Sequence, residues 1–91
     1  MAERNQLTSN AVPHHWREYG AADFTANPEG LSLLLDGYYP RLVVMKECGD
    51  LYAQCEDGLS TVLTGLPAWY PHQGYTARIM PGQTAAIIVY W

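Results

Sequence analysis

The sequence predicts a small all-β protein, an antiparallel β-sandwich of about six strands that follows an extended N-terminal arm. Two observations support this fold class. From Leu31 onward, short apolar segments alternate with turn signals roughly every 8–12 residues, and no segment between them has helical periodicity. Before Gly30, neither strand nor helix periodicity extends over a useful length. The chain has 91 residues, enough for one domain.

Residues 1–30 are predicted to form the arm, in which a short helix could span 13–19 between a proline and a following glycine. The arm is rich in Asn, Ser, Thr, Ala and Gly, yet it carries Trp16, Tyr19 and Phe24. Aromatic side chains on an irregular segment indicate docking, because they bury a large area. We expect the arm either to pack across its own domain or to cross onto a neighbouring subunit; a disordered arm is the third alternative.

Residues 31–91 are predicted to form the sandwich. Its strands are expected where apolar or β-branched residues dominate, at 31–35, 41–46, 51–55, 59–63, 75–80 and 85–91. Turn residues separate these segments, at Asp36-Gly37, Gly49-Asp50, Glu56-Asp57-Gly58 and Pro81-Gly82-Gln83. We interpret the turns at 49–50 and 81–83 as hairpin turns between strands that are neighbours in the chain.

The last segment, Ala85–Trp91, is an apolar run with no polar residue after it. Such a strand must be covered, either by its own domain or by a neighbouring subunit. A chain of this length also buries only about 60–65% of its unfolded surface, so disulfides, metal or oligomerisation usually support it. We therefore expect a homo-oligomer, for which a trimer or a pentamer is plausible.

The two cysteines, Cys48 and Cys55, are expected to be free thiols, because a hairpin at Gly49-Asp50 would hold their sulfurs several residue pairs apart. A disulfide between subunits is the alternative. No Cys-x-x-Cys or His-x₃-His spacing occurs, so we expect no metal and no other cofactor. Nothing in the sequence forces a Cys–His pair or a carboxylate pair in a cleft, so we expect no enzymatic activity.

The charge pattern limits the classes of partner. The net charge is −4, and the five basic residues are scattered, so no stripe could follow a phosphate backbone and no nucleic acid is expected. The longest apolar run is far shorter than the roughly 20 residues of a membrane-spanning helix. The polar start of the chain is not typical of a secretory signal. We expect synthesis in the cytoplasm and no membrane partner.

The aromatic residues are the candidate binding residues. Trp69, Tyr70 and His72 lie in the longest loop of the predicted sandwich. Trp and Tyr anchor many interfaces, but they can equally close the end of a sandwich core. The predicted partner-binding set consists of seven residues: Trp16, Tyr19, Phe24, Trp69, Tyr70, His72 and Trp91.

Several motifs follow one another in a characteristic order over residues 41–91. They are Gly49-Asp50-Leu51, Glu56-Asp57-Gly58, Thr61-Val62, Leu66-Pro67-Ala68 and Gly82-Gln83-Thr84-Ala85. This order and spacing resemble a family of small virion proteins of tailed bacteriophages, which includes the head spike-base proteins of gene-transfer agents. Ala68-Trp69 stands where that family has Ala-Gly, and only Arg78 remains of the basic residues typical of its penultimate strand.

The resemblance implies a non-enzymatic structural protein of the virion. Such a protein would be a head decoration protein or spike-base component on the capsid surface, synthesised in the host cytoplasm, that binds the major capsid protein or a fibre protein. The alternative is a carbohydrate- or receptor-binding β module of a fibre or tail tip. In that module Trp69 and Tyr70 would form a stacking platform, with Asp57 or His72 as polar partners.

Overall fold

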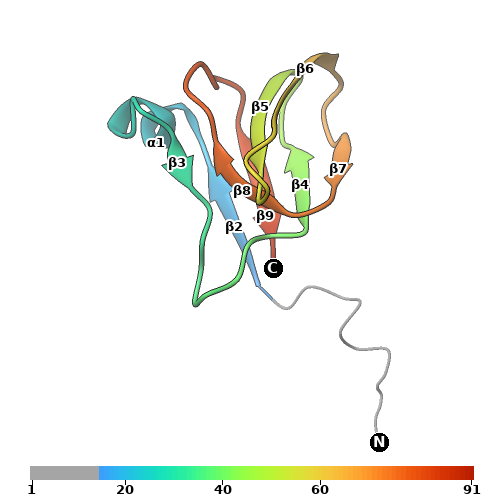
Figure 1. The fold of residues 1–91 in the computed structure, drawn as a ribbon. Coiled ribbons are helices and arrows are strands. Elements are labelled where there is room, and N and C mark those ends of the chain that lie inside the picture. Colours follow the sequence, from blue (N-terminus) through green and yellow to red (C-terminus); the bar gives the residue numbers. More distant parts are fainter. Residues whose placement is uncertain (1–14) are drawn as a thin grey trace, which may run out of the picture.

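A computed structural model describes residues 15–91, which form two four-stranded antiparallel sheets and one short helix (Figure 1). In chain order the elements are β2 (Trp16–Tyr19), α1 (Ala21–Ala26), β3 (Leu31–Ser32), β4 (Leu42–Met45), β5 (Gly49–Cys55), β6 (Ser60–Leu66), β7 (Pro71–Gln73), β8 (Thr76–Ile79) and β9 (Ile87–Tyr90). The predicted fold class, a small all-β sandwich, is confirmed. The described residues form eight strands rather than about six.

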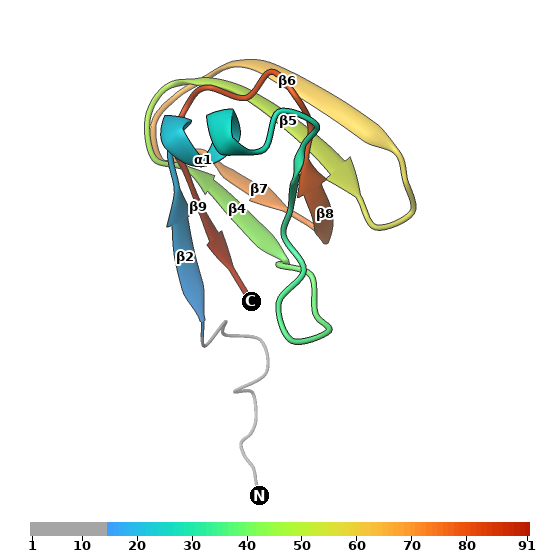
Figure 2. The ribbon, with the colours of Figure 1, turned by 90° about the vertical axis from the view of Figure 1, so that its left-hand side faces the viewer.

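The first sheet has the strand order β2-β9-β4-β7, and the second has the order β3-β8-β5-β6. The two sheets lie over one another as layers, with α1 at one end of the gap between them (Figure 2). The core fills this gap, and its most buried side chains come from the interior strands, among them Val43, Leu51, Ile79 and Val89. Burial of this apolar area, at about 25 cal/mol per Å², is the main stabilising term.

The last strand of the described chain lies inside the first sheet. β9 pairs with β2 on one side and with β4 on the other, and Ile87 and Val89 are completely buried. The chain therefore covers this strand itself. Both pairing edges of this strand and its inner face are thus covered within the described chain.

The described part of the predicted arm packs on its own domain, which is the first of the alternatives given for it. β2 pairs with β9, with Trp16 opposite Tyr90 and Tyr19 opposite Ile87. The helix expected over 13–19 is wrong in its described part. The free edge of β9 offers a ladder of backbone hydrogen bonds, which outweighs a weak local helix preference. Residues 1–14 lie outside the described residues.

The single helix of the described chain lies after the expected one. It begins after Gly20, whose N–H donates a hydrogen bond of 2.9 Å to Oδ2 of Asp23. A carboxylate in the first turn stabilises a helix because the free N–H groups there carry partial positive charge. The helix brings Phe24 against the core.

The two predicted hairpins at 49–50 and 81–83 are wrong, because at both places the chain crosses from one sheet to the other. β4 and β9 belong to the first sheet, whereas β5 and β8 belong to the second. Gln83 joins the two crossings. Its Oε1 accepts a hydrogen bond from the N–H of Tyr52, and its Nε2 donates to the carbonyl oxygens of Asp50 and Ala85, all at 2.8–2.9 Å.

The turn at Glu56-Asp57-Gly58 joins β5 and β6 as a hairpin, with Ala53 opposite Thr61. Cys48 is exposed and Cys55 is half-buried, and both are free thiols. Their separation does not arise from a hairpin at Gly49-Asp50, since β4 and β5 lie in different sheets.

Candidate interaction surface

The first sheet is apolar on both of its faces. In β4, Val43 and Met45 are completely buried, while the alternate residues Leu42 and Val44 are half-buried. Successive side chains of a strand point to opposite faces, so Leu42 and Val44 face away from the core. β9, with the sequence IIVY, differs in one respect, because its outward-facing Ile88 is only 9% exposed and Tyr90 is half-buried. Unbroken apolar strands of this kind are typical of sheets that are covered on both faces.

The strand register places the outward side chains in two rows. One row consists of Trp16, Tyr90, Leu42 and Gln73, and the other of Glu18, Ile88, Val44 and Pro71. We name these eight residues the outer face. The carboxylate of Glu18 forms an ion pair with Lys46, so the one charged residue of the outer face is neutralised. The outer face therefore offers a largely uncharged, apolar surface.

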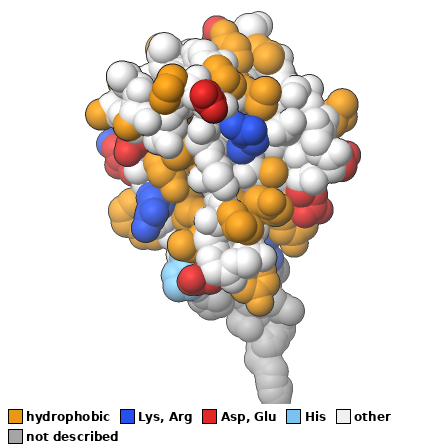
Figure 3. Space-filling view, turned by 60° about the vertical axis from the view of Figure 1, so that its left-hand side comes forward, with side chains coloured by type: hydrophobic (Ala, Val, Ile, Leu, Met, Phe, Trp, Pro, Cys, Tyr) orange, Lys and Arg blue, Asp and Glu red, His pale blue; other side chains and the backbone are white. Residues whose placement is uncertain are grey.

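Basic side chains are spaced apart on the side of the molecule that Figure 3 shows, whereas hydrophobic side chains form several groups there. Trp16 stands at the β2 edge of the outer face and is 66% exposed. Its strand neighbour on the same face is Tyr90. A tryptophan that exposes most of its surface beside a half-buried tyrosine extends the apolar surface beyond the interior strands.

Trp69 lies before the opposite edge strand, β7, and is 62% exposed. Its φ angle is +68°, in the left-handed region that costs an ordinary residue about 1–2 kcal/mol. The turn fixes this conformation, because the N–H of Trp69 donates to Met45 O and the N–H of Tyr70 donates to Pro67 O. Glycine is the usual residue at such a position. An exposed tryptophan is therefore held here at a cost in stability.

His72 is half-buried, and its register partner in β4 is the completely buried Val43. It thus belongs to the inward-facing set of the first sheet, at its edge. Burial lowers the pKa of the imidazole, because the charged form is less well solvated there. His72 is therefore separated from the outer face by the alternation of the strand, although it follows Trp69 and Tyr70 closely in the chain.

Three of the seven predicted binding residues pack on the core. Tyr19 is buried, and Phe24 and Trp91 pack against the core cluster. The Nε1–H of Trp91 donates a hydrogen bond of 3.2 Å to the carbonyl oxygen of Leu33. The other four lie at the two edges of the first sheet: Trp16, Trp69, Tyr70 and His72.

The sequence interpretation missed the interior of the outer face. Leu42 and Val44 lie there, yet they were interpreted only as part of a strand; Ile88 and Tyr90 belong to the run 85–91, for which cover by the domain or by a neighbouring subunit was expected. The signal was present in the sequence. An apolar run without alternation predicts a strand whose two faces both avoid water, whereas a core needs only one of them.

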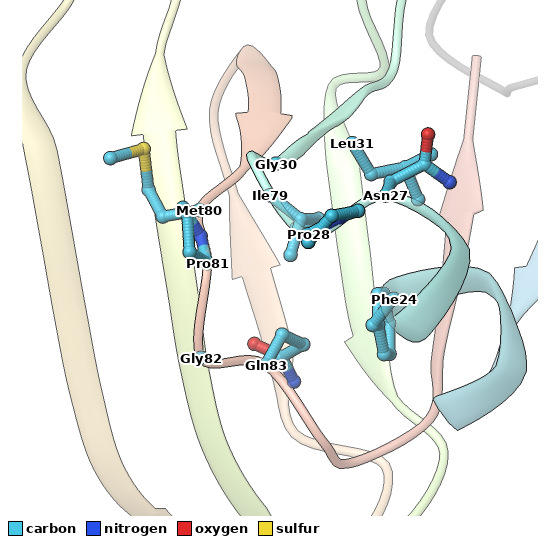
Figure 4. Close-up of a pocket in the computed structure, with 10 residues that line it drawn as sticks. All are labelled: Phe24, Asn27, Pro28, Gly30, Leu31, Ile79, Met80, Pro81, Gly82 and Gln83. Atoms are coloured by element: carbon cyan, nitrogen blue, oxygen red, sulfur yellow. The ribbon is translucent and has the colours of Figure 1, made fainter.

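A small pocket lies between the segment around Phe24 and Leu31 and the loop that carries Pro81 and Gln83 (Figure 4). Its volume is about 70 Å³. Pockets that hold organic ligands usually measure about 300–1,000 Å³. The pocket can hold a few water molecules but not a cofactor, so the outer face is the stronger candidate for binding.

Within residues 15–91, no group of three or more His, Cys, Asp and Glu side chains is placed to hold a metal ion. The single helix of this described part, α1, is not long and apolar enough to cross a membrane. Comparisons with protein-family models, with curated proteins and with solved structures find no significant match for this chain.

Proposed function

We propose that this chain is a non-enzymatic structural protein of a tailed-bacteriophage virion, a head decoration or spike-base component that binds a neighbouring capsid or fibre subunit. The motif order over residues 41–91 supports the virion assignment through its resemblance to small virion proteins. The outer face supports the mechanism, which is adhesion. In this mechanism no covalent bond is made or broken, and the binding free energy comes from apolar burial.

The observation that carries the adhesion mechanism of this proposal is the second apolar face of β4 and β9. The core needs only the face with Val43 and Val89, and solvent would favour polar residues on the other. The chain instead places the half-buried Leu42 and Val44 there, beside Ile88, which its own neighbours already cover. The uncharged, apolar composition of this surface is similar to that of the core of an obligate protein interface.

Trp69 supplies a second argument for the same function. It occupies the position at which the resembling family has glycine, and its backbone has the conformation that glycine favours. The exposed indole gains little stability from its own domain. A residue that costs stability and stays in solvent is accounted for if it contacts a partner.

The geometry gives less support to a carbohydrate-binding module. That alternative needs Asp57 or His72 beside Trp69 and Tyr70. Asp57 lies in the turn before β6, and Trp69 follows the other end of this seven-residue strand, so about 20 Å of strand separates them. His72 belongs to the inward-facing set. A stacking platform with these polar partners is therefore not assembled.

Quantitative mass spectrometry of purified phage particles tests the proposal. We expect the chain in stoichiometric amounts in particles that encode it. The variant Val44→Lys should fold, because Val44 is half-buried on the face away from the core, and should be depleted from particles at least tenfold, since a buried unpaired charge opposes docking. Ala22→Lys, at an exposed helix position, is the matched control and should be incorporated normally.

Two outcomes would contradict the proposal. One is the absence of the chain from purified particles. The other is normal incorporation of Val44→Lys, which would separate the outer face from assembly. Binding of a glycan array by the monomeric chain, lost in Trp69→Gly, would favour the carbohydrate-binding alternative.

A further inference from the structure

The four edge strands found within residues 15–91 are protected to different degrees. β3 is two residues long, and β7 is three residues long and begins with a proline. β2 carries the charged residues Arg17 and Glu18. Short strands, prolines and charges are the usual means by which proteins prevent pairing at a sheet edge.

β6 lacks all of these protections. It is seven residues long, and the stretch from Leu59 to Leu66 contains neither a proline nor a charged residue. Val62 and Leu59 are 52% and 65% exposed. In the described part of the chain, β6 is therefore the edge that is most open to another strand.

The hydrogen-bond pattern identifies the backbone groups that the edge presents. The N–H of Cys55 donates to the carbonyl oxygen of Leu59, so the backbone carbonyl group of Leu59 points toward β5. In an antiparallel pair the direction of the backbone groups alternates. The register then directs the N–H and C=O of Thr61 and Leu63 toward β5, and those of Ser60, Val62 and Thr64 toward the open side.

The open edge ends at a defined place. Gly65 has a φ of +66°, and its N–H donates to Oδ1 of Asp50 at 3.0 Å. The register between β5 and β6 shifts in the same region, between Gly49 and Leu51. The regular segment that an incoming strand can extend is thus Ser60–Thr64, whose midpoint is Val62.

We propose that β6 pairs with β6 of a second copy of this chain, antiparallel and centred on Val62. In this register Val62 lies opposite Val62 of the other copy, and Ser60 lies opposite Thr64. Each Val62 then exchanges both of its backbone hydrogen bonds with its counterpart. The two second sheets become one continuous sheet of eight strands.

Charge favours a second copy as the occupant of this edge. The paired segments are neutral, so antiparallel self-pairing brings no like charges together. The acidic turn Glu56-Asp57 of one copy lies beyond the end of the other's strand, beside the uncharged Pro67-Ala68. Two identical β6 strands can therefore pair without electrostatic repulsion, as a two-fold interface requires.

The inference deepens the proposed assembly role and rests on it, since it names one contact that such a subunit makes. A two-fold contact closes after two copies, so this pairing by itself gives a dimer. A ring of three or five subunits would need a different, head-to-tail contact. The oligomer number consequently tests the pairing directly.

Sedimentation equilibrium of the purified chain, combined with amide hydrogen exchange, tests the inference. We expect a dimer of twice 10.2 kDa at high concentration. The amides of Val62 and Thr64 should exchange at least about tenfold more slowly in the dimer than after dilution to the monomer. Val62→Pro should be monomeric, because proline removes the outward N–H without breaking a hydrogen bond to β5.

Val62→Thr is the matched control and should remain dimeric, since it keeps the N–H and the β-branched shape. Thr64→Lys tests the same edge by charge and serves if the proline variant does not fold. A wild-type chain that stays monomeric up to about 1 mM overturns the pairing, as do dimers of both Val62→Pro and Thr64→Lys. A monomeric chain that still enters particles overturns only the pairing, whereas a dimer absent from particles overturns only the proposed function.

Discussion

Trp91 and Leu33 join the two sheets at one end of the sandwich. The Nε1–H of Trp91, which follows β9 in the first sheet, donates a hydrogen bond of 3.2 Å to the carbonyl oxygen of Leu33. Leu33 extends β3 of the second sheet, because its own N–H donates to the carbonyl oxygen of Ala77. Leu33 is 1% exposed, so water does not readily replace the indole.

Replacing Trp91 by phenylalanine should lower the free energy of unfolding by about 1–2 kcal/mol. The aromatic ring keeps most of the packing, but the carbonyl oxygen of Leu33 loses its donor. Urea denaturation followed by circular dichroism measures the change. Trp16→Phe is the control and should shift stability by less than about 0.5 kcal/mol, because Trp16 is largely exposed. Equal losses in the free energy of unfolding for the two variants would contradict the proposed role of Trp91 in joining the sheets.

Gln83 should be among the most sensitive polar residues of the described chain. It is 4% exposed and satisfies three backbone groups, on Tyr52, Asp50 and Ala85. In Gln83→Met these groups lose their partner, so we expect a loss of about 3–5 kcal/mol in the free energy of unfolding. Gln54→Met is the control, with one exposed hydrogen bond to Gly58 and an expected loss below about 1 kcal/mol. A loss below about 1 kcal/mol in Gln83→Met would show that water can replace the amide as hydrogen-bond partner of these three backbone groups.

Trp69→Gly should stabilise the isolated chain and weaken its assembly. Glycine relieves the left-handed backbone at 69, which is worth about 1–2 kcal/mol, and loses about 0.5–1 kcal/mol to the greater freedom of the unfolded chain. The net gain of roughly 0.5–1 kcal/mol should appear as a higher urea midpoint. Incorporation into particles should fall in the same variant. A purely structural tryptophan would give the opposite result, a lower midpoint.

Stability should fall as the pH is lowered through 6.5, and His72 should be one cause. Its pKa in the folded chain lies below the ordinary value of 6.5, because burial disfavours the charged imidazole. Between these two pKa values the unfolded chain binds more protons than the folded one, so the free energy of unfolding rises with pH across this window. The contribution of His72 to stability is complete above pH 6.5 and is lost as the pH falls toward the folded-state pKa. Urea midpoints of wild type and His72→Gln at pH 7.5 and 5.5 measure the effect. The variant should lose less stability on acidification than wild type; an equal loss would assign the pH dependence to other groups.

The extent to which the sequence predicts this fold follows from the range of the interactions. Local signals located the hairpin of β5 and β6, where Glu56-Asp57-Gly58 makes a tight turn between alternating strands. The pairing of β2 with β9 joins residues at opposite ends of the described chain, and no local pattern in Trp16–Tyr19 reveals it. The crossings at 49–50 and 81–83 were mistaken for hairpins, because the same turn residues serve both purposes.

The candidate surface was predictable only in part for a related reason. Aromatic side chains serve cores and interfaces alike, so composition could not separate the core residues Tyr19 and Trp91 from the exposed residues Trp16 and Trp69. The open edge of β6 depends on strand order, which decides whether a neutral strand is interior or exposed. Whether an aromatic residue is buried or exposed, and whether a strand is interior or at an edge, is decided only when the sheets assemble.

The position of β2 predicts sharply different effects for two N-terminal deletions. Removal of residues 2–14 keeps every described strand and every described core residue, so we expect the free energy of unfolding to stay within about 1 kcal/mol of wild type. Removal of residues 2–30 also takes away β2, Tyr19 and Phe24, and it turns β9 into an exposed apolar edge. Because each buried aromatic is worth about 3–5 kcal/mol and a whole domain of this size has only about 5–15 kcal/mol, this chain should not fold.

Circular dichroism and thermal denaturation of the two truncated chains measure this difference. A chain without residues 2–30 that unfolds cooperatively, with strand content like that of wild type, would contradict the assignment of β2 to the first sheet. The comparison also separates stability from assembly. If the chain without residues 2–14 folds normally but no longer enters particles, the removed residues act on a neighbouring subunit, since normal folding excludes a loss of stability as the cause.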